Sequence, residues 1–231
     1  MKMTVDQFQT TLHNLYLGDN NTPSSSDTEY TVRLQFLVDA IRLWEGEKDI
    51  MWNELWTSLA SAADGDKSVN SDDLVYSVPT DFKFLGGHVR TYTVSNSQTY
   101  WQVVKPQEAE LYLNKTGYWV YLTGNKSSGI SVNFGTQPTV GDTIDYPYYK
   151  DAAIPTTGTD VIEMSNPMFA VYLSLSKMHE QDGDGDRAAA ALGTAEELLL
   201  SMRRRNAKLP HYQPNQIQDR QYAVGHNGFG N

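Results

Sequence analysis

Apolar side chains recur at helical spacing along the first quarter of the chain. Residues 4–17 carry apolar side chains at every third or fourth position, which predicts a short helix. A second helix is predicted to open at Asp27 or Thr28 and to continue, with apolar steps of four and three, until a glycine breaks the pattern. Asp49 is a further candidate N-cap, so we expect a third helix over residues 50–63.

The same spacing returns near the C-terminus. Asn166 suits the N-cap of a helix, and Pro167 suits its first position, where a missing N–H leaves no bond unmade. A Gly- and Asp-rich break at 182–186 then precedes a second helix, which Asp186 would cap. The expected buried faces are Met168, Val171, Tyr172, Leu175 and Met178, followed by Ala188, Ala191, Leu192, Ala195, Leu198, Leu199 and Met202. This pattern predicts a helical hairpin with a short turn.

The middle of the chain changes period. Short runs over residues 70–150 alternate Val, Tyr, Thr and Trp with polar residues, and Gly, Ser or Asn lies between them, which is typical of strands and turns. One interruption at 106–113 begins with Pro and predicts a helix of one or two turns. These runs predict a small antiparallel β-domain, and residues 151–160 a linker back to the helices.

These patterns predict an α+β protein whose helical bundle is built from N-terminal helices and a C-terminal helical hairpin. We expect the N-terminal helices within residues 1–68 and an inserted small antiparallel β-domain with its linker over 69–160. The hairpin at 161–206 would complete the bundle. Residues 207–231 would form an extended C-terminal tail.

Composition narrows the class of protein. The chain has 231 residues, no Cys and a mean hydropathy of −0.51, so disulfides and thiolate metal sites are excluded. A net charge of −10 argues against a protein that grips nucleic acid over its whole surface. The first residues lack the apolar core of a signal peptide, and no run approaches the ~20 apolar residues of a membrane span. We therefore expect a cytoplasmic product that does not enter a membrane.

No group of residues has the spacing of a catalytic, metal or cofactor site. The five histidines lie far apart in the sequence. The run DGDGD resembles the start of a calcium loop, but Arg187 and Gly193 stand where that loop needs a Gly and a bidentate Glu. The sequence has no phosphate-binding loop and no nucleophile elbow. We expect no enzyme activity, no cofactor and no metal.

Two C-terminal features are candidate contact sites. Arg203, Arg204 and Arg205 close the second hairpin helix, where they either complement the helix dipole or contact an acidic partner or phosphates. The segment 207–231 is rich in Gln, Asn and Gly, so alone it is expected to be disordered or to extend along a partner. Its apolar residues are spaced like anchors for another surface, namely Tyr212, Ile217, Tyr222, Val224 and Phe229.

A defined order of motifs runs along the chain. The order is a Trp-rich helix with Trp52 and Trp56, LVYSVPTDF, YWQVVKPQEAEL, GYWVYLTG, DYPYYKDAAI, VIEMSNP and finally EELLLSMRRR. This order resembles the head-to-tail connector (adaptor) proteins of tailed bacteriophages, especially the tail tubular protein A type of short-tailed phages. The resemblance covers roughly residues 5–205 and rests on the order of the motifs rather than on any single one.

The resemblance implies a structural virion protein without enzyme activity. It implies a homo-oligomer, a dodecameric ring in the neck of the virion, made in the host cytoplasm, that joins the portal protein to a tail or nozzle protein. The helical part would pack against neighbouring subunits, the β-part would face the tail, and the C-terminal region would reach the portal. DNA would pass through the channel without sequence-specific binding, and the acidic balance fits such a conduit.

An alternative from another class is a carbohydrate- or peptide-binding module. Exposed aromatic residues of the β-domain would stack on the ligand, namely Trp101, Tyr118, Trp119, Tyr148 and Tyr149. Such a module would work as a monomer. It rarely needs two flanking helical layers and a tail, so the sequence favours the connector.

Overall fold

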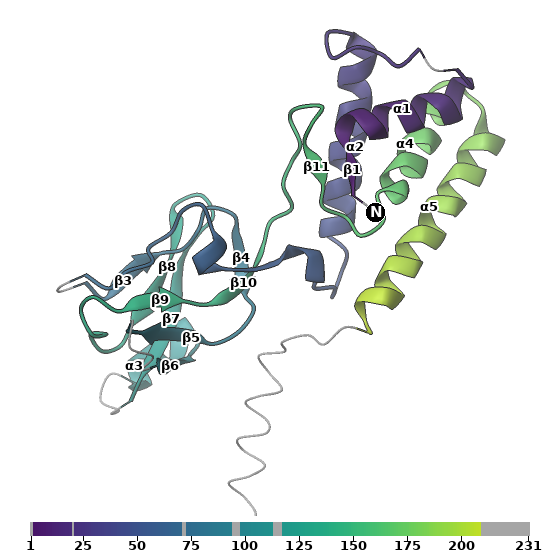
Figure 1. Ribbon diagram of the computed structural model, residues 1–231. Helices are drawn as coiled ribbons and strands as arrows, with labels where there is room; N and C mark the ends of the chain where they lie inside the picture. Colours follow the sequence, from purple (N-terminus) through teal and green to yellow (C-terminus); the bar gives the residue numbers. More distant parts are fainter. Residues whose placement is uncertain (1, 20, 71–72, 94–97, 113–116, 209–231) are drawn as a thin grey trace, which may run out of the picture. The chain divides into compact units, whose positions relative to one another are not determined.

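The computed structural model describes most of the chain, and the described residues are 2–19, 21–70, 73–93, 98–112 and 117–208. The protein is α+β, and its chain divides into two compact units. The helical unit combines Met1–Leu55 with Ala152–Pro210, and the β unit contains Trp56–Asp151. The helical unit is therefore assembled from segments on both sides of the β unit in the sequence (Figure 1).

Two N-terminal helices form where the apolar spacing predicts them: α1 (Val5–Leu17) and α2 (Thr28–Glu45). Thr4 caps α1, because its Oγ1 accepts from the N–H of Gln7 at 3.3 Å while the Gln7 side chain accepts from the N–H of Thr4 at 3.0 Å. The helix ends at Gly18, whose φ of 76° lies in the left-handed region that glycine tolerates best. Both predicted helices are confirmed.

The C-terminal part of the helical unit contains α4 (Met168–Gln181) and α5 (Gly185–Asn206), so both predicted hairpin helices are present. The predicted cap of the second helix is wrong. The Asp184 side chain accepts from the N–H of Arg187 at 3.2 Å, and Asp186 lies inside the first turn of α5.

The start of α4 differs from the prediction by one residue. Pro167 occupies the N-cap position, and the helix begins at Met168. Asn166 still supplies a side-chain acceptor at this terminus, because its Oδ1 accepts from the N–H of Met168 at 3.3 Å. Since helix ends commonly shift by a residue, the predicted terminus is close to the observed one.

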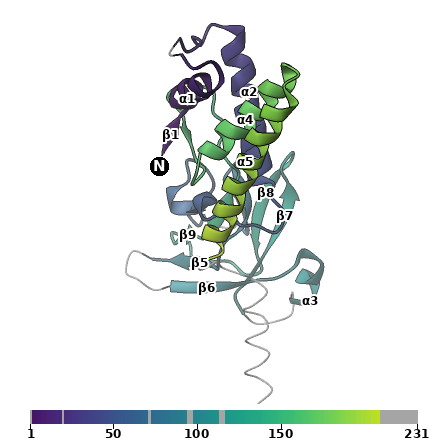
Figure 2. The same cartoon turned by 90° about the vertical axis from the view of Figure 1, so that its right-hand side faces the viewer.

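Helix α4 is the central element of the helical unit, because it contacts α1, α2 and α5. In Figure 2, α5 is nearest the viewer, and α4 and then α2 lie behind it. Val171, Leu175 and Met178 are buried as predicted, whereas Met168 and Tyr172 are only half-buried. A helix packed on several sides has no single apolar stripe, so further positions are buried, namely Phe169, Ala170, Ser174, Ser176 and His179.

Helix α5 buries a narrower face than predicted. Leu198 and Leu199 are half-buried, and Leu192 is 40% exposed. The buried residues of this helix are Ala188, Ala191, Ala195, Met202 and Asn206. Because three of them are alanines, α5 can lie close to α4 with little side-chain volume between the two helices.

A two-stranded antiparallel sheet connects the start of α1 to the segment before α4. Its strands are β1 (Met3–Thr4) and β11 (Val161–Ile162). Beside this sheet, the N–H of Asp6 donates to the Gly158 carbonyl at 2.9 Å. A Cβ at Gly158 would overlap the Asp6 carboxylate, so a larger residue there would force this side chain to move.

The predicted third helix over residues 50–63 is wrong. The segment contains two short 3-10 turns, η1 (Asn53–Leu55) and η2 (Leu59–Ser61), and strand β2 (Trp56–Ser58) between them. Asp49 does not cap a helix, because its φ of 61° lies in the left-handed region. Strand β2 pairs with β10, and this tertiary pairing overrides a weak local preference for helix.

The β unit contains strands in all the segments that the alternation predicts. A six-stranded sheet has the order β3-β8-β7-β6-β5-β9, and a three-stranded sheet has the order β2-β10-β4. Their bounds are β3 (Val75–Ser77), β4 (Phe82–Leu85), β5 (Val89–Tyr92), β6 (Gln98–Val103), β7 (Trp119–Asn125), β8 (Gly129–Phe134), β9 (Thr143–Asp145) and β10 (Pro147–Lys150).

One strand pairing departs from the predicted antiparallel arrangement. Strands β6 and β7 are parallel, with Gln102 opposite Trp119. Parallel neighbours need a crossover connection, and here η3 (Pro106–Glu108) and α3 (Ala109–Tyr112) lie in that connection. The predicted short helix is therefore confirmed, and it explains why the sheet is mixed.

The core of the β unit is built largely from aromatic rings. Trp101 and Phe134 meet edge to face with ring centroids 4.6 Å apart, and Tyr76 meets Phe134 in the same way at 5.5 Å. Trp101 also donates from Nε1 to Thr91 Oγ1 at 3.1 Å, which satisfies its buried N–H. Burial raises the pKa of Tyr146 far above its ordinary value, as expected for a phenol in this core.

Candidate functional site

The arginine cluster predicted as a contact site lies at the C-terminal end of α5. Arg203 Nη1 forms an ion pair with Glu47 Oε1 at 3.2 Å within the helical unit. Arg204 and Arg205 are exposed in the last turn, where their charges complement the helix dipole. The structure therefore divides the cluster into one arginine with an internal contact and two that face solvent.

Asn206, which the sequence pattern does not single out, holds the end of α5. Its Oδ1 accepts from the N–H of Asn53 at 3.1 Å and from Asn53 Nδ2 at 2.8 Å, and its Nδ2 donates to the Met51 carbonyl at 2.8 Å. These bonds fix Arg204 and Arg205 relative to the segment that follows α2. No local pattern marks Asn206, because Asn53 lies 153 residues earlier in the chain.

The candidate anchors of the C-terminal tail lie outside the described residues. These are Tyr212, Ile217, Tyr222, Val224 and Phe229. The described chain ends at Lys208, just after α5, so the role of these anchors stays a prediction.

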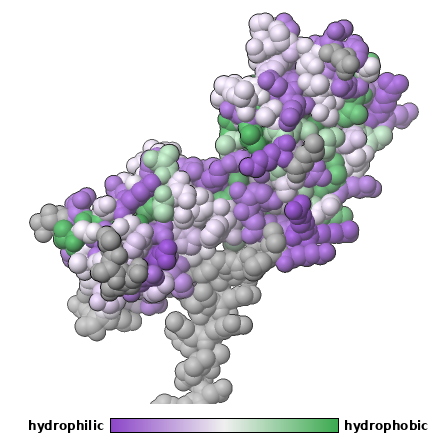
Figure 3. All heavy atoms as spheres, viewed as in Figure 1, coloured by the Kyte–Doolittle hydropathy of each residue, from purple (hydrophilic) through white to green (hydrophobic). Residues whose placement is uncertain are grey.

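Apolar side chains reach the surface on two helices of the helical unit. Leu192 and Leu200 of α5 are 40% and 43% exposed, and Leu43 of α2 is 52% exposed. Val32 is also exposed, and because it lies about three helical turns before Leu43, the two share one face of α2. Figure 3 shows hydrophobic residues at the surface of this unit.

A layer of polar side chains lies inside the helical unit. We call Gln9, His13, Arg33 and Ser174 the polar layer; they come from α1, α2 and α4, and each is at most 3% exposed. Gln9 Nε2 donates to the Tyr30 carbonyl at 3.1 Å. Within the described chain, Gln9 Oε1, Ser174 Oγ and two nitrogens of Arg33 (Nε and Nη1) have no hydrogen-bond partner. Such buried groups make a core less favourable than an apolar one.

Arg33 fixes the tautomer of His13. Arg33 Nη2 contacts Glu29 Oε1 and lies 3.2 Å from His13 Nδ1. Because a guanidinium only donates, His13 Nδ1 accepts, and the ring proton lies on Nε2, which is 2.6 Å from Asp19 Oδ1. The backbone N–H of Asn21 lowers the pKa of Asp19, and the His13 ring lowers it further.

Tyr16 extends these polar contacts toward the turn between α4 and α5. Its hydroxyl donates to Asp182, and its ring centroid lies 5.4 Å from that of His179. The hydrogen bond to Asp182 raises the pKa of Tyr16, and burial raises it further. These contacts hold the end of α1 against the end of α4, which is a structural role.

The described residues contain no group of three His, Asp or Glu side chains that could hold a metal ion. In the Asp-rich run at 182–186, the first three residues form the turn between α4 and α5, where Asp184 serves as a helix cap, and the last two begin α5. None of the described helices combines the length and the apolar character needed to cross a membrane.

The aromatic residues predicted to stack on a ligand are mostly core residues. Trp101, Trp119, Tyr148 and Tyr149 are each at most 3% exposed, and Tyr118 alone of this set reaches the surface, at 59%. The prediction that these side chains are exposed is therefore wrong for four of the five. Trp101 and Tyr148 belong to the main core of the β unit, and Trp119 packs in a smaller cluster with Val104 and Ala109.

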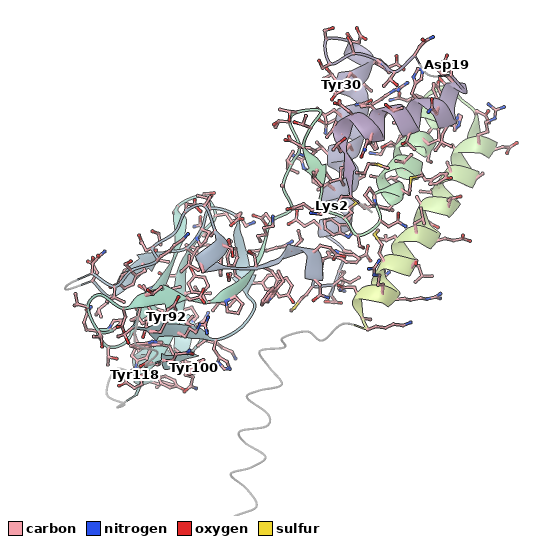
Figure 4. All side chains as sticks on the ribbon, viewed as in Figure 1. Lys2, Asp19, Tyr30, Tyr92, Tyr100 and Tyr118 are labelled. Carbon is pink, nitrogen blue, oxygen red and sulfur yellow. The ribbon has the colours of Figure 1, made fainter. Side chains whose placement is uncertain are left out.

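Other aromatic side chains of the β unit face outward. Val89, Thr91 and Trp101 point into the core, so the residues between them on β5 and β6 point away from it. We call the outward row the outer strip; its members are Arg90, Tyr92, Gln98, Tyr100 and Gln102. Figure 4 shows Tyr92 and Tyr100 on the same side of the β unit.

Polar contacts connect the members of the outer strip. Arg90 donates from Nε at 3.2 Å and from Nη2 at 2.6 Å to Asp145 Oδ2, and this bond raises the pKa of the guanidinium. The same guanidinium lies 5.5 Å from the centroid of the Tyr92 ring. The Tyr100 hydroxyl donates to Gln98 Oε1 at 2.9 Å. The alternation of residues in β5 (VRTY) and β6 (QTYWQV) was visible in the sequence. Strand pairing decides which of the alternating residues face outward.

Comparison with known proteins assigns the chain to no family. No family model matches it, and no curated protein sequence matches it significantly.

Proposed function

We propose that the protein is a head-to-tail connector, a structural virion protein that joins the portal of a phage capsid to its tail. In this proposal the subunits form a dodecameric ring in the neck of the virion and line part of the DNA channel. A bundle of N-terminal helices and a C-terminal hairpin would carry the inserted β unit and an extended tail. The protein would act without enzyme activity, cofactor or metal.

One observation carries the proposal: the helical unit is made from both ends of the chain, and the β unit interrupts it. Helix, sheet and helix follow one another in the order of the motifs that resemble the connector family, from the N-terminal helices to the arginines that end α5. The arrangement supports the resemblance, although the Trp-rich segment with Trp52 and Trp56 is not a helix.

Surface features of the helical unit are compatible with neighbouring subunits. Leu192 and Leu200 on α5 and Val32 and Leu43 on α2 present apolar side chains to solvent in the isolated chain. In a ring, one outer helix of a subunit would meet a different face of the next subunit, as every head-to-tail interface requires. Arg204 and Arg205 would lie near the partner that the tail reaches.

The test is assembly with the portal. Purified protein is mixed with portal rings of the phage that encodes it, and the product is imaged by electron microscopy. We expect a symmetric ring stacked on the portal. Absence of both ring and portal binding would refute the connector role.

A matched pair of variants tests the subunit contact. Leu200→Asp should reduce ring formation at least about tenfold, because a carboxylate would enter an apolar contact. Leu111→Asp, at an exposed leucine of the β unit, is the control and should assemble normally. Leu198 is a poorer probe, because it is half-buried within the subunit. If the two variants assemble equally well, Leu200 on α5 does not lie in the contact between subunits.

A further inference from the structure

We propose that the outer strip of the β unit binds a neutral carbohydrate, which would lie across the Tyr92 and Tyr100 rings. This inference does not depend on the connector role, because it concerns only side chains of the β unit.

The strand register brings the outer strip together on one sheet face. Arg90 lies opposite Tyr100, and Tyr92 lies opposite Gln98, so the two tyrosines are diagonal neighbours across the β5–β6 pair. The strip lies on β5 and β6, between the flanking strands β9 and β7, and Tyr100 is 58% exposed.

The chemistry of the strip fits a sugar chain. A sugar ring has an apolar face of C–H groups that packs on an aromatic ring, and Tyr92 and Tyr100 offer two such rings. Sugar hydroxyls both donate and accept, and the amides of Gln98 and Gln102 provide donors and acceptors beside the rings. The bond from the Tyr100 hydroxyl to Gln98 Oε1 holds one ring in place before a ligand arrives.

Charge argues for a neutral ligand. Arg90 is the one cation in the strip, and Asp145 neutralises it through two hydrogen bonds. A nucleic acid or an acidic sugar would need unpaired cations along its path. A neutral polyhydroxylated chain satisfies this condition. Protein contacts also use Tyr and Arg, so docking of a protein partner is a separate outcome of the test.

The test is affinity electrophoresis in native gels that contain neutral polysaccharides. The panel is amylose, mannan, galactan, xylan and glycol chitin, and the full-length protein is run in each gel beside a sugar-free gel. We expect at least one polysaccharide to retard the protein. Tyr100→Ala should lower that apparent affinity about tenfold, the effect of losing one ring contact.

Tyr118→Ala is the matched control. Tyr118 is equally exposed, at 59%, but its ring contacts the inward-pointing Trp101 with centroids 5.0 Å apart. The control should keep its affinity, and circular dichroism should show both variants folded. The inference is overturned if no gel retards the protein, or if Tyr100→Ala and Tyr118→Ala behave alike. It is also overturned if Tyr100→Ala weakens docking to a protein partner while no polysaccharide binds.

Discussion

The helical unit and the β unit differ in what fills their cores. In the β unit, rings such as Trp101 and Phe134 pack edge to face, and the buried indole N–H of Trp101 has its acceptor. Two buried polar atoms of this unit, the Tyr146 hydroxyl and Asp142 Oδ1, have no partner within the described chain. In the helical unit, the polar layer occupies part of the interior, and several of its atoms lack partners within the described chain. Arg33, at 1% exposure, is the largest member of that layer.

This difference indicates where a binding partner has most to contribute. The β unit fills its core with large rings, although Tyr100 and Tyr118 are exposed, so its stability should depend mainly on its own packing. The helical unit contains six of the eight unpaired buried side-chain atoms of the described chain, and leucines such as Leu43 and Leu200 are exposed on its helices. A neighbouring subunit that covers these leucines would stabilise the helical unit by mass action.

The largest expected effect is in the aromatic core. Trp101→Ala should lower the free energy of unfolding of the β unit by about 3–5 kcal/mol, because it removes the ring that Phe134 and Tyr118 contact. Denaturant titration followed by near-UV circular dichroism measures this loss. Tyr100→Ala, at the exposed neighbour, should change the value by less than about 0.5 kcal/mol. A comparable loss in both variants would contradict the contrast between core and surface.

The next effect has the opposite sign and belongs to the polar layer. The double change Arg33→Met and His13→Leu should leave the stability of the helical unit unchanged or raise it by about 1 kcal/mol, because it removes both buried partners and leaves neither unpaired. Glu29 would not be stranded, because its side chain is 50% exposed. Denaturant titration followed by circular dichroism at 222 nm tests this, and Arg42→Met, at an exposed arginine of α2, is the control. A loss of about 3 kcal/mol or more would show that the polar layer stabilises the fold.

The smallest effect is a difference in acid sensitivity. Asp160 accepts from the N–H groups of Thr156 and Thr157, both at 2.8 Å, and these bonds lower its pKa. A lowered folded pKa gives stability that is present above the unfolded pKa of about 3.9 and is lost as pH falls through the folded value. The helical unit should therefore weaken below about pH 4, and Asp160→Asn should flatten this dependence. An identical acid titration at 222 nm for both proteins would contradict it.

The sequence was informative where a structure depends on neighbouring residues. Helix α1 has a capping box in Thr4 and Gln7 and a terminating Gly18, and these signals act within a few residues. Local apolar spacing also predicted α2, α4 and α5, although the predicted cap of α5 was wrong. The helix predicted over residues 50–63 was wrong because part of this segment pairs with β10. That strand lies about 90 residues away in the sequence, so local patterns do not reveal the pairing.

The candidate sites show the same limit. Arg204 and Arg205 could be placed at the end of a helix from the sequence, but the role of Asn206 could not, because its partner Asn53 is distant in the chain. Aromatic residues could be assigned to the β unit, yet register decides that Trp101 faces inward and Tyr100 outward. A count of rings therefore could not distinguish a core from a binding surface.

The discontinuous helical unit has a consequence for synthesis on the ribosome. Helices α1 and α2 emerge first, and roughly 100 residues of the β unit follow before α4 appears. At ~5–20 residues per second, the two helices wait on the order of 5–20 s for their central packing partner. The β unit is continuous in the chain and can fold at once. The nascent chain should thus hold a finished sheet domain beside two helices with bare apolar faces, a state that chaperones would recognise.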